Sequence, residues 1–361
     1  MITSRLTLKL HRMSPCAIRK IIFALLSIAW LSASIGMTVN SESSDPRDSK
    51  VQVNLDPHQV LGVESCEKCH AAEVIVWRQT PHNETFATLH RKPEAQRIAQ
   101  KMGIDSFKEN SACMKCHYTV KVQAGGLEAV AGVTCESCHG AAQVWVSLHN
   151  DYGGTGVTKN GESAEHRIQR LRASIQGGMR NPVNVYMVAQ SCYRCHTVPD
   201  ERLVNIGGHK EGSMDFEMVS WSQGMVRHNF LRSNGQTNES SNPERLRQLF
   251  MAGMIADLEF SLRATAAATE KAKFGINSAQ RAERAAKRLQ AAQGKLNQPL
   301  LEEIQTVFSN VRLKLNNTAE LTEAADRIAA LGIRFAATVK GEDLAAMDAF
   351  IPPADRWKNV Q

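Results

Sequence analysis

The stretch GVTCESCHGAAQVWVSLH spans residues 132–149 and contains two cysteines and a histidine within five positions. Two residues separate Cys135 from Cys138, and His139 follows the second cysteine directly. A further histidine, His149, comes ten residues after His139. Two questions follow from this spacing: what the C-x-x-C-H group binds, and whether His149 serves the same site as His139.

The C-x-x-C-H pattern occurs four times in the chain of 361 residues. The copies are the first motif (Cys66, Cys69, His70), the second motif (Cys113, Cys116, His117), the third motif (Cys135, Cys138, His139) and the fourth motif (Cys192, Cys195, His196). They use every one of the nine cysteines except Cys16. Two thiols at this spacing add to the vinyl groups of a haem, and the adjacent histidine binds its iron. We therefore predict four covalently bound haem c groups.

Three other interpretations of the cysteines are weaker. Paired C-x-x-C motifs hold zinc in many proteins, but zinc sites need no histidine directly after each pair. Thioredoxin-like motifs occur within a βαβ pattern, which this sequence lacks. Four local disulfides would leave the four adjacent histidines unexplained.

Each iron has a second axial position, and histidine is the predicted distal ligand. Beyond residue 40, the histidines outside the motifs are His58, His82, His90, His149, His166, His209 and His228. Methionines in the same region are rival ligands, but the histidines outnumber the four positions to be filled. Bis-histidine coordination lowers the reduction potential relative to a Met ligand.

The spacing of His149 predicts that it serves a different haem from His139. The segment between them is predicted to be helical, and ten helical residues rise about 15 Å. Axial nitrogens on one iron are only about 4 Å apart. We therefore expect His149 to reach a neighbouring haem, and the same argument applies to His82, which follows His70.

Residues 1–40 are predicted to be a cleaved signal peptide, with a basic start followed by an apolar run. Its basic residues are Arg5, Lys9, Arg12, Arg19 and Lys20. Subtracting them from the formal charge of +7 leaves about +2 for the remaining chain, too little to suggest nucleic-acid binding. The expected location is the periplasm, with membrane attachment only if this segment is retained.

The predicted fold class is mainly α, with a loop-rich multihaem c-type cytochrome domain followed by a C-terminal helical bundle. The expected parts are a polar lead-in at 41–60, a tetrahaem domain at 61–232, a linker at 233–242 and the bundle at 243–361. Asn242 and Pro243 form a predicted helix start. One hypothesis is that the bundle docks the protein to a larger complex or to a second copy, in which case its removal should leave the haem spectrum intact.

Roughly residues 61–230 resemble the tetrahaem cytochrome c-554 family. The similarity lies in CEKCHAAEVIVWRQTPH around the first motif, in GVTCESCHG at the third, and in FEMVSWSQGMVRH near His228. The resemblance implies that His149 caps the haem of His70, His82 that of His139, and His228 that of His196. It also implies a five-coordinate second haem, at His117, that binds a small molecule such as nitric oxide.

His209 lies where the family has no ligand, so either it or one of His58, His90 and His166 is a candidate to close the second haem. His209 is also a candidate to displace His228. The first functional hypothesis is therefore a periplasmic electron carrier of nitrogen metabolism, acting between redox protein partners. The alternatives are an oxidoreductase that reduces nitric oxide at an open iron, and a haem subunit of a larger complex.

Overall fold

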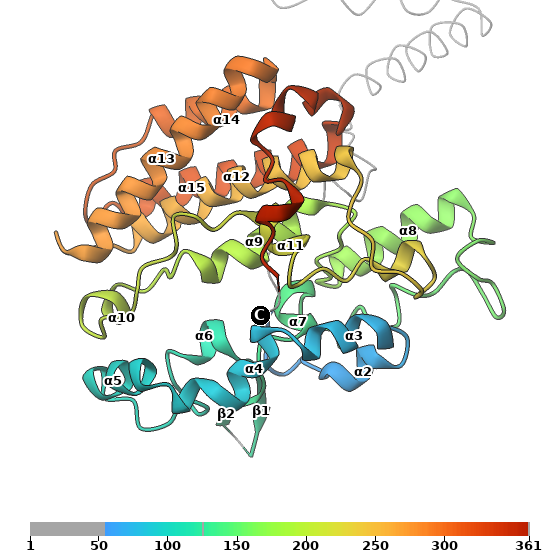
Figure 1. Ribbon diagram of the computed structural model, residues 1–361, viewed down its shortest axis with the longest axis horizontal. Coiled ribbons are helices and arrows are strands. Elements are labelled where there is room, and N and C mark those ends of the chain that lie inside the picture. The colour runs from blue at the N-terminus through green and yellow to red at the C-terminus, as the bar shows by residue number, and fades with distance from the viewer. Residues whose placement is uncertain (1–54, 125, 360–361) are drawn as a thin grey trace, which may run out of the picture. The chain divides into compact units, whose positions relative to one another are not determined.

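A computed structural model describes residues 55–124 and 126–359 of the chain, and this part is mainly helical, as predicted (Figure 1). The expected signal peptide at 1–40, with Cys16, and most of the lead-in at 41–60 lie outside the described residues. Within the described ranges, no helix has the length and apolar character that crossing a membrane requires.

The four motifs lie on or beside short helices. Up to residue 232, the helices are α2 (Val63–Glu67), α3 (Ala71–Arg78), α4 (Pro81–Thr88), η2 (Leu89–Arg91), α5 (Pro93–Met102), α6 (Met114–His117), α7 (Cys135–His139), α8 (Ala164–Gln176), α9 (Val185–His196), α10 (Glu201–Asn205), α11 (Met218–Ser222) and η3 (Phe230–Arg232). Around the first motif these helices bury few side chains: α2 and α4 bury none, and α3 buries only Val74. Side chains alone therefore form little of the interior there.

A two-stranded antiparallel hairpin connects the second motif to the third. Strand β1 (Thr119–Gln123) pairs with β2 (Gly126–Ala131), and the register shifts between Thr119 and Val120. The Thr119 hydroxyl lies 2.9 Å from the Thr134 hydroxyl and 3.0 Å from that of Ser137. The hairpin thereby connects directly to the helix of the third motif.

The C-terminal helices form the predicted bundle. They are α12 (Pro243–Ala266), α13 (Lys273–Leu296), α14 (Pro299–Ser309), α15 (Thr318–Thr338), η4 (Glu342–Phe350) and η5 (Ala354–Arg356). The Asn242 side chain accepts a hydrogen bond from the Arg245 amide at 3.0 Å, and Pro243 occupies the first turn. This cap satisfies an amide at the helix start, which lies where the sequence predicted it.

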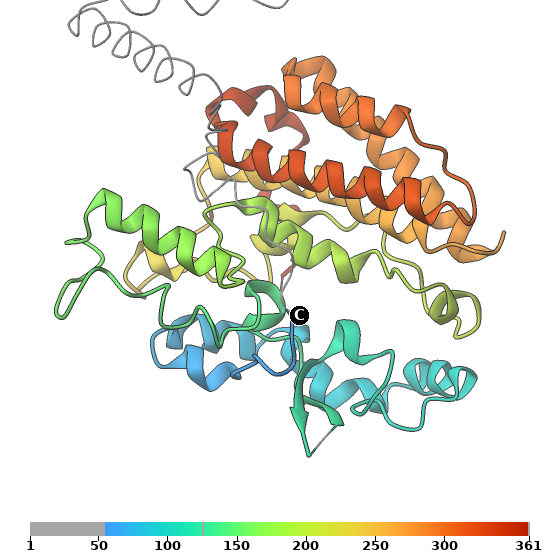
Figure 2. The same cartoon turned by 180° about the vertical axis from the view of Figure 1, so that it is seen from behind.

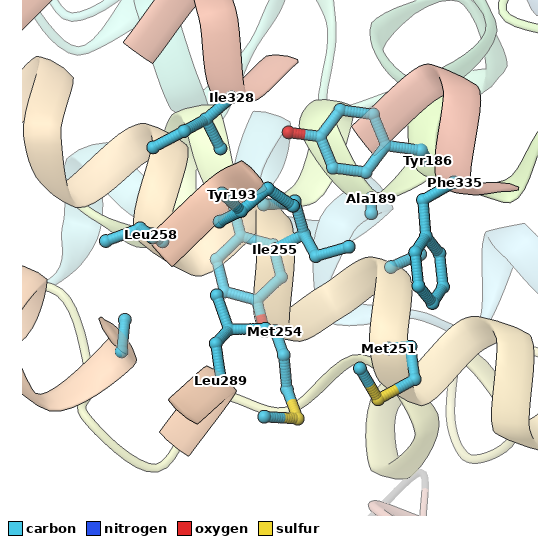
Figure 3. Close-up of a cluster of buried hydrophobic side chains, with 14 of the residues drawn as sticks. Tyr186, Ala189, Tyr193, Met251, Met254, Ile255, Leu258, Leu289, Ile328 and Phe335 are labelled. Atoms are coloured by element: carbon cyan, nitrogen blue, oxygen red, sulfur yellow. The ribbon is translucent and has the colours of Figure 1, made fainter. Parts of the chain in front are cut away.

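Helix α12 lies at the centre of the largest hydrophobic cluster and packs against α9, α13 and α15 (Figures 1 and 2). Figure 3 shows Tyr186, Ala189 and Tyr193 of α9 among side chains of α12, α13 and α15. The fourth motif lies at the end of α9, so haem region and bundle share one core. The expected linker at 233–242 therefore separates two parts of the sequence but not two hydrophobic cores.

Candidate haem sites

Each motif histidine faces one distal histidine. The ring centres are 6.3 Å apart for His70 and His149, 6.3 Å for His82 and His196, 6.3 Å for His117 and His209, and 6.2 Å for His139 and His228. The eight rings come from segments far apart in the sequence, yet the four separations are nearly equal. Such uniformity indicates four sites of one kind.

The separation fits an iron between two imidazoles. Nitrogens about 4 Å apart on opposite sides of one iron put the centres of their rings about 6 Å apart. Each pair also includes the histidine of a C-x-x-C-H motif, whose thiols are positioned to hold the porphyrin. The residues present therefore fit four haem c groups, each with two axial histidines.

The observed pairs differ from those implied by the family resemblance at three haems. His149 lies beside His70, as implied. His82 lies beside His196 rather than His139, and His228 lies beside His139 rather than His196. His209 lies beside His117, the haem for which an open position was implied.

The other three candidate histidines lie elsewhere. His166 Nδ1 is 2.8 Å from Glu162 Oε1. The His58 side chain is exposed, and His90 Nδ1 is buried with no hydrogen-bond partner in the described part of the chain. No ring contact within the described ranges joins any of them to a motif histidine.

Backbone carbonyls orient several of the rings. Nδ1 lies 3.1 Å from the Arg180 carbonyl in His139, 2.7 Å from that of Val146 in His149, 2.6 Å from that of Lys210 in His209 and 2.6 Å from that of Val226 in His228. A carbonyl only accepts, so Nδ1 carries the proton and Nε2 keeps its lone pair for a metal.

Burial keeps three of the motif imidazoles neutral, which is the form that binds iron. Desolvation lowers the pKa of His117 to about 4, that of His139 to about 4 and that of His196 to about 3. It also lowers the pKa of His82. At pH 7 these side chains need not lose a proton before they coordinate.

Contacts between cysteines of different motifs show which sites are neighbours. Cys66 shares a hydrogen bond with Cys135, which lowers the pKa of Cys66 and joins the first motif to the third. Cys116 shares one with Cys195, which lowers the pKa of Cys195 to about 7 and joins the second motif to the fourth. Burial raises the pKa of Cys192, and the nearby Cys138 raises it further, so the third and fourth motifs are also neighbours.

The glutamate of the third motif anchors the approach to the first. Glu136 is 2% exposed, and its carboxylate accepts hydrogen bonds from the amides of Leu61, Gly62 and Ala142 at 2.9, 2.8 and 2.8 Å. These bonds fix the chain just before Cys66 against the third motif. The sequence contained no signal of this role, because the two inner positions of the motif accept any residue.

We expect Glu136→Ala to destabilise the protein by several kcal/mol, because three amides lose their acceptor at about 1–3 kcal/mol each. Thermal unfolding followed by circular dichroism measures the change. The control is Glu64→Ala, which removes an exposed glutamate just before the first motif. Equal unfolding temperatures for the two variants would contradict the assigned role.

Residues 143–149 form turns, and 140–142 are irregular, instead of the predicted helix. The Ala142 amide donates to Glu136, and the Gln143 amide donates to the Gln59 carbonyl at 3.0 Å. These amides are therefore diverted from helical partners. Even so, His149 points to a haem site other than that of His139, as the spacing predicted.

Gly132 and Val133 hold the segment that carries His82. The Val133 amide donates to the His82 carbonyl at 2.9 Å, and the Val133 carbonyl accepts from Trp77 Nε1 at 2.7 Å. A Cβ on Gly132 would lie 2.2 Å from the His82 carbonyl oxygen and 2.7 Å from that of Asn83. Only glycine permits this close approach.

We expect Gly132→Ala to displace His82 from its position opposite His196. A methyl group at 2.2 Å from a backbone oxygen forces that backbone to move, at a cost of about 1–3 kcal/mol. The measurement is electron paramagnetic resonance of the oxidised protein, in which a displaced ligand gives a high-spin signal. The matched control is Gly294→Ala, which meets no atom within 4 Å. A Gly132→Ala spectrum identical to that of the control would contradict the prediction.

An ion pair holds the backbone of His149. Arg170 Nη1 donates to the His149 carbonyl at 2.7 Å, and its Nε and Nη2 each donate to Glu162 at 2.6 Å. The Glu162 side chain is 2% exposed, and Arg170 lowers its pKa to about 2. Sequence reasoning missed both residues, since the fold alone brings α8 to His149.

Residues 65–140 match the protein family described as cytochrome c554 and c-prime. This segment resembles the cytochrome c-554 family. It contains the first three motifs and His82, whereas the fourth motif and the other three distal histidines lie beyond it.

A relative of that description is cytochrome c-554 of Nitrosomonas europaea, which is 30% identical over 100 residues. The aligned segment covers 26% of this chain and 43% of the relative, so the chain spans less than half the length of the relative that it matches. No solved structure matches the chain. The resemblance to the c-554 family is therefore partial, and the family match ends well before the bundle.

Proposed function

We propose that the protein is a tetrahaem c-type cytochrome that relays electrons between redox partner proteins. The observation that carries the proposal is the set of four histidine pairs with ring centres 6.2–6.3 Å apart. The c-554 family implies covalently bound haem c, and the count of four follows from the four motifs. The predicted signal peptide supports a periplasmic location.

The chain's own residues would hold each haem in the same way. Two cysteines of a motif would anchor the porphyrin, and the motif histidine and the distal histidine would both bind its iron. When bound, the haem supplies one-electron redox chemistry. The protein orients the axial rings through backbone carbonyls and excludes water from the buried imidazoles.

The contacts between motifs support one continuous path for electrons. The first motif contacts the third through Cys66 and Cys135, and the second contacts the fourth through Cys116 and Cys195. The third lies beside the fourth through Cys138 and Cys192. The proposed order is therefore first, third, fourth, second, with the first and second haems at the two ends.

The position of His209 disfavours catalysis at an open iron. Its ring lies beside that of His117, and the Lys210 carbonyl accepts from its Nδ1. A filled second axial position leaves no place for nitric oxide to bind. Reduction of nitrogen oxides therefore ranks below electron transfer.

The proposal is tested by electron paramagnetic resonance of the oxidised protein, together with a haem count per chain. We expect four haems, all low-spin, and no change in the spectrum on adding nitric oxide to the oxidised sample. A high-spin signal of one haem per chain would instead establish an open iron and favour the catalytic alternative. A count other than four would contradict the proposal.

A further inference from the structure

Arg180 has two backbone contacts with the proximal histidine of the third motif. Its amide donates to the His139 carbonyl at 2.8 Å, and its own carbonyl accepts from His139 Nδ1 at 3.1 Å. The imidazole is thus held at both its backbone and its ring. Any displacement of Arg180 would turn the ring relative to the iron that it is proposed to bind.

The side chain of Arg180 is fully buried, with 0% of its surface exposed. Its Nε donates to Ser191 Oγ at 2.7 Å, and its Nη2 donates to Gln190 Oε1 at 2.9 Å and to the Met187 carbonyl. Its Nη1 is buried and has no hydrogen-bond partner among the described residues. All its acceptors are neutral groups on α9.

The nearest carboxylate in this network is one side chain further away. Gln190 Nε2 donates to Glu259 Oε2 at 2.8 Å, and Glu259 is itself bound by Tyr186 and Arg263. Burial lowers the pKa of Arg180 to about 10, so the guanidinium is charged at pH 7. The described part of the chain therefore holds a buried cation with no directly bonded anion.

This cation lies between the third and fourth motifs. Ser191, which accepts from Arg180, donates to the Cys138 carbonyl at 2.8 Å. The side chains of Cys138 and Cys192 also lie close enough to the guanidinium to influence its pKa, although burial has the larger effect. In a water-poor interior, a charge acts strongly on its neighbours because little solvent screens it. A positive charge stabilises the reduced iron, which carries one positive charge fewer than the oxidised iron.

We propose that Arg180 is a positioning residue that orients His139 and, through its buried charge, raises the reduction potentials of the haems at the third and fourth motifs. The proposal rests on the proposed function, because it needs haems at those motifs. A reduced redox partner protein would supply the electron, being oxidised by one electron for each ferric iron that becomes ferrous, and Arg180 would neither gain nor lose a proton.

The test is a potentiometric titration of the purified four-haem protein, followed by optical and paramagnetic resonance spectra. We expect Arg180→Gln to lower one or two of the four midpoint potentials by at least about 59 mV. For one electron, this shift is a tenfold change in the reduction equilibrium constant. Arg180→Lys keeps the positive charge, so its midpoint potentials should fall by less than half as much as those of Arg180→Gln. The control Arg284→Gln removes an exposed charge from α13 and should leave all four midpoints unchanged.

Three results would overturn the proposal: unchanged midpoints in Arg180→Gln, an equal shift of all four, or an equal fall in Arg180→Lys and Arg180→Gln. If Arg180→Gln does not fold, the Glu259→Gln variant tests the proposal instead, because it removes the negative charge from the same hydrogen-bond network. We expect it to raise the same midpoints, and a fall or no change would overturn the proposal. A wild-type protein without haem would instead refute the proposed function.

Discussion

Replacing His209 with alanine is expected to convert one haem of the four from low spin to high spin. The His209 ring lies 6.3 Å from that of His117, so its removal leaves that iron with one protein ligand. The open position then admits water or nitric oxide. Paramagnetic resonance of the oxidised variant measures the high-spin signal, and its integral should correspond to one haem per chain.

The matched control for this experiment is His166→Ala. His166 is one of the spare histidines, and its ring contacts Glu162 rather than a motif histidine. This variant should keep the wild-type spectrum. An entirely low-spin His209→Ala protein would show that another residue binds the iron of the second motif, and the assignment of His209 would be wrong.

Deleting residues 243–361 is expected to abolish the native haem region. Tyr186, Ala189 and Tyr193 of α9 are buried in the core that α12 completes. Exposing a large apolar side chain costs about 1.5–3 kcal/mol, and a whole domain is stable by only about 5–15 kcal/mol. Removal of the bundle therefore leaves too little stabilising free energy to keep α9 folded, and α9 carries the fourth motif.

The measurement is the number of haems per truncated chain and its unfolding curve. We expect fewer than four haems, with the fourth motif affected first, and no cooperative transition. This reverses the sequence-based expectation that the haem spectrum survives the deletion. A truncated chain with four low-spin haems would show that the shared core is dispensable, and would support a bundle that serves only for docking.

Some of the site could be read directly from the sequence. The cysteines and proximal histidines of the motifs have a fixed local spacing, so no tertiary information was needed to predict them. The helical bundle could also be predicted, since Asn242 and the apolar periodicity after it are local signals. The prediction that His149 serves a different site from His139 followed from their separation along the chain, although the segment between them forms turns and not the expected helix.

The distal pairs of the other haems could not be predicted in this way. His82 lies beside His196 because Val133 and Trp77 fix its segment against the third motif, and these contacts join residues far apart in the sequence. The family resemblance also gave no ligand for the second haem, where the structure places His209. Buried polar groups such as Glu136 were missed because their burial depends on the complete fold.

The four histidine pairs have a consequence for chain entropy. Each pair joins segments about 80 to 115 residues apart, and a covalently held haem with a distal ligand closes that length into a loop. The loops overlap, because the last of them begins at His139, before the first ends at His149. The proposed haems would thus restrict the unfolded chain as interlocking disulfides do, for as long as each distal histidine stayed on its iron, and this loss of denatured-state entropy would stabilise the folded protein.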